Sequence, residues 1–158
     1  MKLYHGTNID FEKIDLSLCK PNKDFGRGFY LTDIKNQASQ MAVRRCDFSK
    51  KGSPIVQEYE IDDSVLKTGE LKVKVFDKVS PEWAEFILKN REKNRHYSFD
   101  YDVVIGPIAD DGVVLQLNLY ERHLIDINQL VRGLTYHDLN SQFCFRTERA
   151  IKYLRRVE

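Results

Sequence analysis

Three polar side chains in this sequence stand beside glycines or loops at the ends of expected strands. His5 comes directly before Gly6 in KLYHGT, Tyr30 follows the Gly-rich turn of FGRGFYLT, and Gln142 opens the apolar stretch QFCF. An imidazole, a phenol and an amide can hydrogen-bond a sugar, and the phenol ring can stack on a flat ligand. Each also has an ordinary structural explanation, namely a hydrogen-bonded histidine, a core aromatic ring and a strand-edge amide.

The elements that must position these side chains can be read from hydrophobic periodicity. Alternating or apolar stretches bounded by glycine, proline or polar clusters predict strands over residues 2–5, 28–32, 53–62, 71–77, 101–107 and 142–146. Residues 10–28 form a long polar loop with Pro21 and two glycines, and loops of that length are often functional.

Helical spacing predicts a helix over residues 33–48, with Thr32 or Asp33 as its cap. Pro81 after Ser80 predicts a second helix start. Residues 115–134 read as one helix that ends at Gly133, and a closing helix follows Thr147. Strands and helices are mixed without regular alternation, so we expect a single α+β domain over residues 1–158.

Composition limits the function classes. The chain has 158 residues, 42% of them hydrophobic and 31% charged, with a net charge of +1, which argues against a main partner that is a bare phosphate backbone. The arginine pairs at 44–45 and 155–156 are expected to lie on solvated helix faces. Three scattered cysteines without a CxxC pair give no support for zinc. No signal peptide or membrane span is visible, so we expect a cytoplasmic protein with reduced thiols and no membrane partner.

Four motifs in order carry a resemblance to a known family. They are LYHGT, then FGRGFYLT followed by a helix containing Gln37 and Ala38, then YDVVIGPIADD, and finally SQFCFRTERAIKYL. Together they cover nearly the whole chain and resemble the bacterial family DUF3990, of the ADP-ribosyltransferase-like superfamily. The resemblance implies a split, two-sheet α+β fold with flanking helices and an NAD-binding cleft.

The superfamily marks this cleft with a histidine, a tyrosine and usually a glutamate on three strands. The first two match His5 and Tyr30, and the third falls on Gln142. By resemblance, His5 would bond a ribose hydroxyl, and Tyr30 would stack on the nicotinamide. Gln142 would bond the 2′-hydroxyl of the nicotinamide ribose.

Three further residues complete the expected NAD site. The backbone of Gly6, with Thr7 beside it, would hold the nicotinamide carboxamide, because a residue without Cβ lets a ligand approach. Arg27 would pair with the diphosphate, since a guanidinium matches phosphate oxygens; the alternative is a solvated loop arginine. No metal site is expected.

The glutamine is the departure from the family pattern. A carboxylate stabilises the oxocarbenium ion that forms on the ribose, whereas an amide offers only a dipole. Loss of one such partner costs roughly 10²–10³ in rate. Glu148 is a candidate substitute, with a helix N-terminus as its structural alternative. Asp110 and Asp111 are others, with a polar turn as theirs.

The resemblance therefore implies an enzyme that moves ADP-ribose from NAD to a macromolecular acceptor, as a bacterial toxin or effector paired with a small antitoxin protein. The alternative is a catalytically weak or inactive module that binds NAD or ADP-ribose. A phosphotransferase acting on RNA 2′-phosphate is less favoured, because arginines are sparse around the motifs. The sequence leaves protein, nucleic acid and small molecule open as acceptors.

Overall fold

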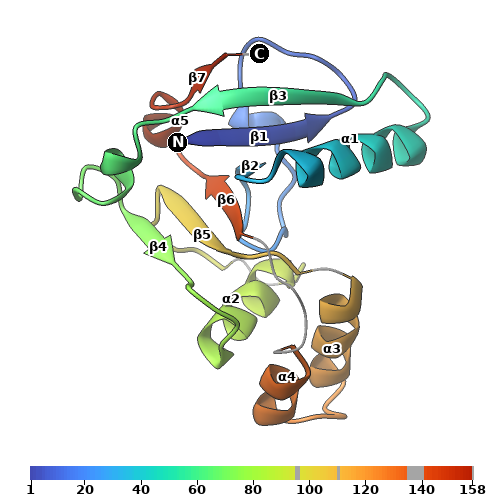
Figure 1. The fold of residues 1–158 in the computed structure, drawn as a ribbon. Helices are drawn as coiled ribbons and strands as arrows, with labels where there is room; N and C mark the ends of the chain where they lie inside the picture. Colours follow the sequence, from blue (N-terminus) through green and yellow to red (C-terminus); the bar gives the residue numbers. More distant parts are fainter. Residues whose placement is uncertain (95–96, 110, 135–140, 158) are drawn as a thin grey trace.

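The strands of the computed structural model form one sheet, seen in Figure 1. The structure describes residues 1–94, 97–109, 111–134 and 141–157, without the side chain of Asp111. The strand order is β4-β5-β6-β2-β1-β3-β7. The α+β class is confirmed, but the described strands make a single sheet of seven strands, where the resemblance led us to expect two sheets.

One half of the sheet is built around the N-terminal strand. This half comprises β1 (Lys2–Thr7), β2 (Phe29–Thr32), β3 (Ile55–Glu60) and β7 (Arg155–Arg156). β1 and β3 pair along their whole length, from Lys2 opposite Glu60 to Thr7 opposite Ile55. Between β1 and β2 the described register is Tyr4 opposite Thr32. The sheet is therefore most weakly paired beside His5.

The other half comprises β4 (Val73–Val75), β5 (Val103–Pro107) and β6 (Ser141–Phe145). β4 and β5 are parallel, and β6 pairs antiparallel with both β5 and β2. All six predicted strands are thus confirmed. The short strand β7 was missed, and the expectation that Arg155 and Arg156 lie on a helix is wrong.

The helices and 3-10 turns divide between the two halves of the sheet (Figure 1). They are η1 (Leu16–Leu18), α1 (Lys35–Ser49), η2 (Asp63–Leu66), α2 (Pro81–Arg91), α3 (Asp111–Glu121), α4 (Ile127–Leu134) and α5 (Glu148–Ile151). α1 lies along β1, whereas α2, α3 and α4 gather at the end that holds β5 and β6.

Local capping explains where the helices begin. The Ser80 hydroxyl accepts a hydrogen bond from the backbone of Trp83, so the predicted start of α2 at Pro81 is confirmed. α1 begins after Ile34, and the Thr32 hydroxyl accepts from the Ile34 amide rather than capping the helix directly.

The helix predicted over 115–134 is two helices, α3 and α4. His123 has a positive φ of 58°, which interrupts the helical backbone. Asp126 then accepts from the Gln129 amide, and the Gln129 side chain accepts from the Asp126 amide. This reciprocal capping box starts a new helix.

Two cores lie on opposite faces of the sheet. The first core includes Leu3, Phe29, Leu31, Tyr59, Phe143 and Phe145. The second core includes Phe25, Trp83, Phe86, Ile87, Val104 and Cys144, with Tyr30 packed against it. Successive side chains of a strand point to opposite faces, so Tyr30 faces away from Phe29 and Leu31.

Candidate functional site

The three expected site residues lie on neighbouring strands. Thr32 on β2 is opposite both Tyr4 on β1 and Gln142 on β6. His5 follows Tyr4, and Tyr30 lies two residues before Thr32. The fold therefore brings positions 5, 30 and 142 to one place in the sheet, although they are far apart in the sequence.

His5 is buried, with 6% of its surface exposed. Its Nδ1 lies 2.7 Å from the carbonyl oxygen of Tyr30. A carbonyl only accepts, so Nδ1 carries the proton and Nε2 is an acceptor. Arg45 Nη1 lies 3.5 Å from Nε2. The ring packs on Phe29, with ring centroids 4.3 Å apart.

The pKa of His5 is lowered to about 4, chiefly by burial; the hydrogen bond to Tyr30 opposes this shift, and the charge of Arg45 adds to it. Burial disfavours the imidazolium because it removes water from around the charge. His5 is therefore neutral at pH 7, in a tautomer that the Tyr30 carbonyl fixes.

Tyr30 is tied into the Gly-rich turn before it. Its hydroxyl donates to the Gly26 carbonyl at 2.6 Å and accepts from the Phe25 amide at 2.9 Å. Burial raises the pKa of this phenol well above its ordinary value, so it stays protonated. The hydroxyl thus shapes the turn, and the ring is the part of Tyr30 suited to stacking on a ligand.

Gln142 is 9% exposed and lies opposite Thr32 and Gly106. Its Nε2 donates to the Pro107 carbonyl at 3.3 Å, and the Trp83 indole donates to the same oxygen. By strand alternation, Gln142 shares a sheet face with Tyr30. His5 instead packs on Phe29 of the first core and meets Tyr30 through its backbone carbonyl, so the imidazole and the phenol do not touch.

Gly6 and Thr7 have structural partners of their own. A Cβ on Gly6 would lie 2.0 Å from the Ala38 carbonyl oxygen, so glycine is required there by the packing of α1. The expectation that the missing Cβ of Gly6 gives a ligand access is therefore wrong on the side of Gly6 that faces α1. The Thr7 hydroxyl donates to the Ile9 carbonyl at 3.0 Å.

Cations gather around Arg45 beside His5, and sequence reasoning predicted only Arg27 among them. Arg44 is exposed as expected, but Arg45 is half-buried, and burial lowers the pKa of its guanidinium. Arg27 is exposed and donates to the Ser17 carbonyl. Burial raises the pKa of the Cys19 thiol, and the charges of Arg27, Arg45 and Lys23 oppose that shift. The loop over residues 10–28 thus brings Lys23 and Arg27 towards Arg45.

Of the candidate substitute acids, Glu148 is the one whose side chain the structure describes. Glu148 is exposed and is the first residue of α5, as its structural alternative predicted. Asp110 and the side chain of Asp111 lie outside the described residues. Asp24, near Tyr30, is paired with Arg91 at 2.6 Å. Among the described residues, no group of three metal-ligating side chains is found.

The comparison with protein families gives one match. The family described as "Protein of unknown function (DUF3990)" matches residues 1–156, so the chain belongs to this family. No curated protein and no solved structure matches the chain. None of the helices in the described part of the chain is long and apolar enough to cross a membrane.

Proposed function

We propose that this chain is an NAD-dependent ADP-ribosyltransferase that breaks the nicotinamide–ribose bond and transfers ADP-ribose to a macromolecular acceptor. The observation that carries the proposal is the state of His5, which is neutral and fixed through Nδ1. Such an imidazole offers Nε2 as the acceptor for one ribose hydroxyl. Arg45 now lies 3.5 Å from Nε2, a long contact that a hydroxyl can replace.

The cations near His5 suit the diphosphate of NAD. Arg45 reaches His5 from α1, while Lys23 and Arg27 come from the 10–28 loop. Guanidinium groups match phosphate oxygens in geometry and charge. The pKa of Lys23 is lowered by burial and by the charge of Arg45, so the two cations repel each other until an anion binds between them.

The proposed reaction needs positioning and electrostatics. The acceptor nucleophile forms a bond to C1′ of the ribose and loses a proton, and the C1′–N bond breaks with its electron pair going to nicotinamide, which leaves neutral. Tyr30 would present its ring to the nicotinamide. The Gln142 amide would bond the 2′-hydroxyl, and the backbone of Gly6, with Thr7 beside it, would take the carboxamide. These groups hold the sugar while charge develops on it.

The second candidate function is a module that binds NAD or ADP-ribose without turnover. It is favoured by Gln142, whose neutral amide stands where a carboxylate is usual in the superfamily and donates to the Pro107 carbonyl. A neutral amide cannot stabilise a cation by charge. The remaining expectations, a bacterial toxin role, a small antitoxin partner and a cytoplasmic location, rest on family analogy and are part of the proposal.

Nicotinamide release from NAD, with and without a cell extract as the source of acceptor, tests the proposal. We expect release by the native chain and a loss of roughly 10² or more for His5→Ala and for Gln142→Ala. His5→Gln keeps a donor for the Tyr30 carbonyl and separates loss of chemistry from loss of folding.

Arg45→Ala and Arg44→Ala form a matched pair, because the two residues are neighbours on α1 and only Arg45 is turned inward. Arg45→Ala should raise the KM for NAD, and Arg44→Ala should leave it unchanged. Saturable NAD binding without release would favour the module. Binding of neither NAD nor ADP-ribose would overturn both functions.

A further inference from the structure

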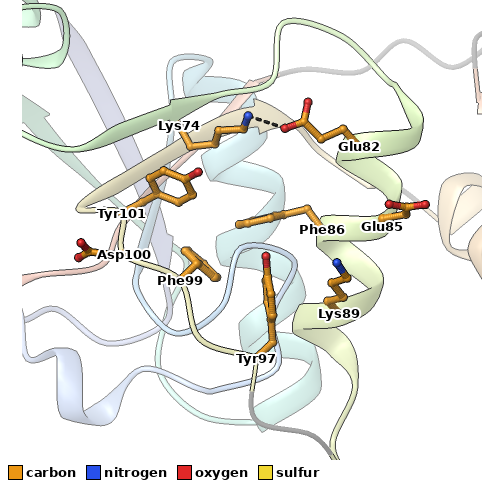
Figure 2. Close-up of a pocket in the computed structure, with 9 residues that line it drawn as sticks. All are labelled: Lys74, Glu82, Glu85, Phe86, Lys89, Tyr97, Phe99, Asp100 and Tyr101. Carbon is orange, nitrogen blue, oxygen red and sulfur yellow. Dashed lines mark hydrogen bonds and ion pairs between the residues drawn. The ribbon is translucent and has the colours of Figure 1, made fainter.

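A second cluster of side chains lies outside the NAD site, on the other side of the Gly-rich turn. Figure 2 shows four rings around one cavity of about 310 Å³, those of Phe86, Tyr97, Phe99 and Tyr101. We name this group the aromatic slot. The volume of the cavity is at the lower end of the range for small-ligand pockets, roughly 300–1,000 Å³.

The rings of the slot form a connected set. Phe99 is central, with its ring centroid 4.7 Å from Phe86, 5.4 Å from Tyr97 and 5.7 Å from Tyr101. Phe86 is buried on α2, whereas 37% of Tyr97 is exposed. Tyr97, Phe99 and Tyr101 occupy every second position in the segment before β5, and their rings lie in contact with one another through Phe99. The four rings therefore form one connected aromatic wall of the cavity.

Cations of the chain itself already occupy ring faces in and beside the slot. The Arg146 guanidinium lies 3.7 Å from the Phe99 centroid, and the Lys89 ammonium lies 5.6 Å from that of Tyr97. Lys74 lies 5.0 Å from the Phe76 ring. The carboxylates of Glu82, Glu85 and Asp100 line the same cavity, so its charges are balanced and a neutral flat group is the better occupant.

Two charged side chains beside the slot can form hydrogen bonds with the edge of a flat ligand. Lys74 pairs with Glu82 at its rim, and Asp100 pairs with Lys72. Within the part of the chain that the structure describes, neither Glu85 nor Lys89 has an ion-pair partner. Both come from α2 (Figure 2). They provide one acceptor and one donor beside four aromatic rings.

We propose that the aromatic slot binds a nucleobase. A base is neutral and flat, and it stacks on aromatic side chains. Its edge carries both donors and acceptors, which match Glu85 and Lys89. Bases with an exocyclic amine suit Glu85 better than uracil, because the N–H of uracil stands between two carbonyl oxygens that repel a carboxylate.

The slot adjoins the turn that holds Tyr30. A Cβ on Gly26 would lie 3.5 Å from the Phe99 ring and 3.6 Å from Arg146 Nε, and the Gly26 carbonyl accepts the Tyr30 hydroxyl. Arg146 Nη1 donates to the carbonyls of Phe99 and Tyr101, which fixes the slot segment. A base in the slot would thus be separated from Tyr30 by the Gly-rich turn at Gly26. The inference itself does not depend on NAD chemistry.

Binding of nucleosides to the full chain, without NAD, tests the inference. Nucleosides lack phosphate, so the cations near His5 cannot account for their binding. We expect saturable binding of adenosine, guanosine and cytidine by ligand-observed NMR, with uridine weaker. Tyr97→Leu should weaken binding about tenfold, and Glu85→Gln should reduce the preference over uridine.

Tyr153→Leu is the matched control, because Tyr153 is 38% exposed and lies near the N-terminus of the chain, away from the slot. It should not change nucleoside binding. A short single-stranded oligonucleotide that binds more tightly than nucleosides would assign the base to a polynucleotide, and equal affinity would assign it to a free nucleotide.

Three results would overturn the inference. The first is that neither nucleosides nor the oligonucleotide bind. The second is that Tyr97→Leu leaves binding unchanged. The third is that a short arginine peptide binds in their place and Tyr97→Leu abolishes that binding. Nicotinamide release is measured separately, so failure of the transferase proposal leaves this test intact.

Discussion

The region around His5 and the aromatic slot satisfy their polar groups in different ways. At His5 the imidazole, the Tyr30 hydroxyl and the Gln142 amide all bond to the protein itself, and the first and last are almost fully buried. At the slot, Tyr97 is exposed, and Glu85 has no ion-pair partner in the described residues. The residues of the His5 region lie on strands of the sheet, whereas the slot is formed by α2 and the segment before β5.

This difference predicts in which region a substitution will change the stability of the fold. Side chains packed into a sheet cannot change without changing the fold, because protein interiors are close-packed. Side chains on an open surface can change with little effect on stability. We therefore expect the His5 region to couple stability with function, and the slot to separate them.

The largest effect should come from Gly6→Ala. The added Cβ would lie 2.0 Å from the Ala38 oxygen and 2.9 Å from the Ala42 nitrogen, which are backbone atoms of α1. The helix must move away from β1, and we expect a loss of about 3 kcal/mol or more in the free energy of unfolding. Urea denaturation measures it.

Gly69→Ala is the control, because nothing lies within 4 Å of its added Cβ and only the positive φ of 84° opposes it. Its cost should be about 1–2 kcal/mol. Equal losses for the two variants would show that α1 is not tightly packed on Gly6.

The pH dependence of stability should be the next largest effect. The pKa of His5 is about 4 in the folded protein and about 6.5 when unfolded. Between these values the unfolded chain binds more protons, so stability is full above pH 6.5 and falls as pH drops towards 4. The total loss from this residue is about 3 kcal/mol.

Urea denaturation at several pH values measures this loss, and His5→Gln should remove that part of the slope. Native and variant curves that run parallel from pH 7 to pH 4 would show that His5 is not the buried neutral group we describe.

A smaller effect is expected at Asp102, which follows Tyr101 of the slot and accepts hydrogen bonds from residues before β4 and around α5. Its carboxylate accepts from the Thr147 hydroxyl at 2.7 Å, and from the Lys72 amide and Arg149 at 2.8 Å each. Asp102→Ala leaves these donors without their acceptor and should cost about 2 kcal/mol in thermal or urea unfolding.

Asp100→Ala provides the comparison, since Asp100 is exposed and forms a surface ion pair with Lys72. We expect its cost to stay below about 1 kcal/mol. A cost at Asp102 no larger than that would mean that the slot lacks a rigid support.

The smallest effect should be that of Tyr97→Leu on stability. Tyr97 is exposed and makes ring contacts to Phe86 and Phe99. We expect the free energy of unfolding to change by about 0.5 kcal/mol or less, although nucleoside binding falls. A large loss of stability would place Tyr97 among the core residues and remove the contrast between the two regions.

Much of the fold could be predicted from sequence because its signals are local. Alternation identified β3 and β4, and Ser80 with Pro81 gave the start of α2. The break between α3 and α4 was missed, although Asp126 and Gln129 carry a capping-box pattern. β7 was missed because a two-residue edge strand has no periodicity to read.

The candidate site was predicted in its positions and missed in its orientation. The resemblance placed residues 5, 30 and 142 together, and the strand order agrees. That His5 packs on Phe29 follows from the pairing of β1 with β2. Arg45 is half-buried, and residues of the 10–28 loop lie near it. No sequence pattern predicts such a contact between a loop and a helix. The aromatic slot had a readable signal, the alternation in YSFDY, which sequence reasoning did not use.

β6 lies between β5 and β2 in the sheet, although it comes late in the chain. During translation, β1 to β5 leave the ribosome well before β6, so the nascent sheet has a gap between β5 and β2. Two unpaired strand edges are exposed during that interval, and such edges promote aggregation. Since β6 also carries Gln142, a partly synthesised chain has neither a closed sheet nor the full set of candidate site residues.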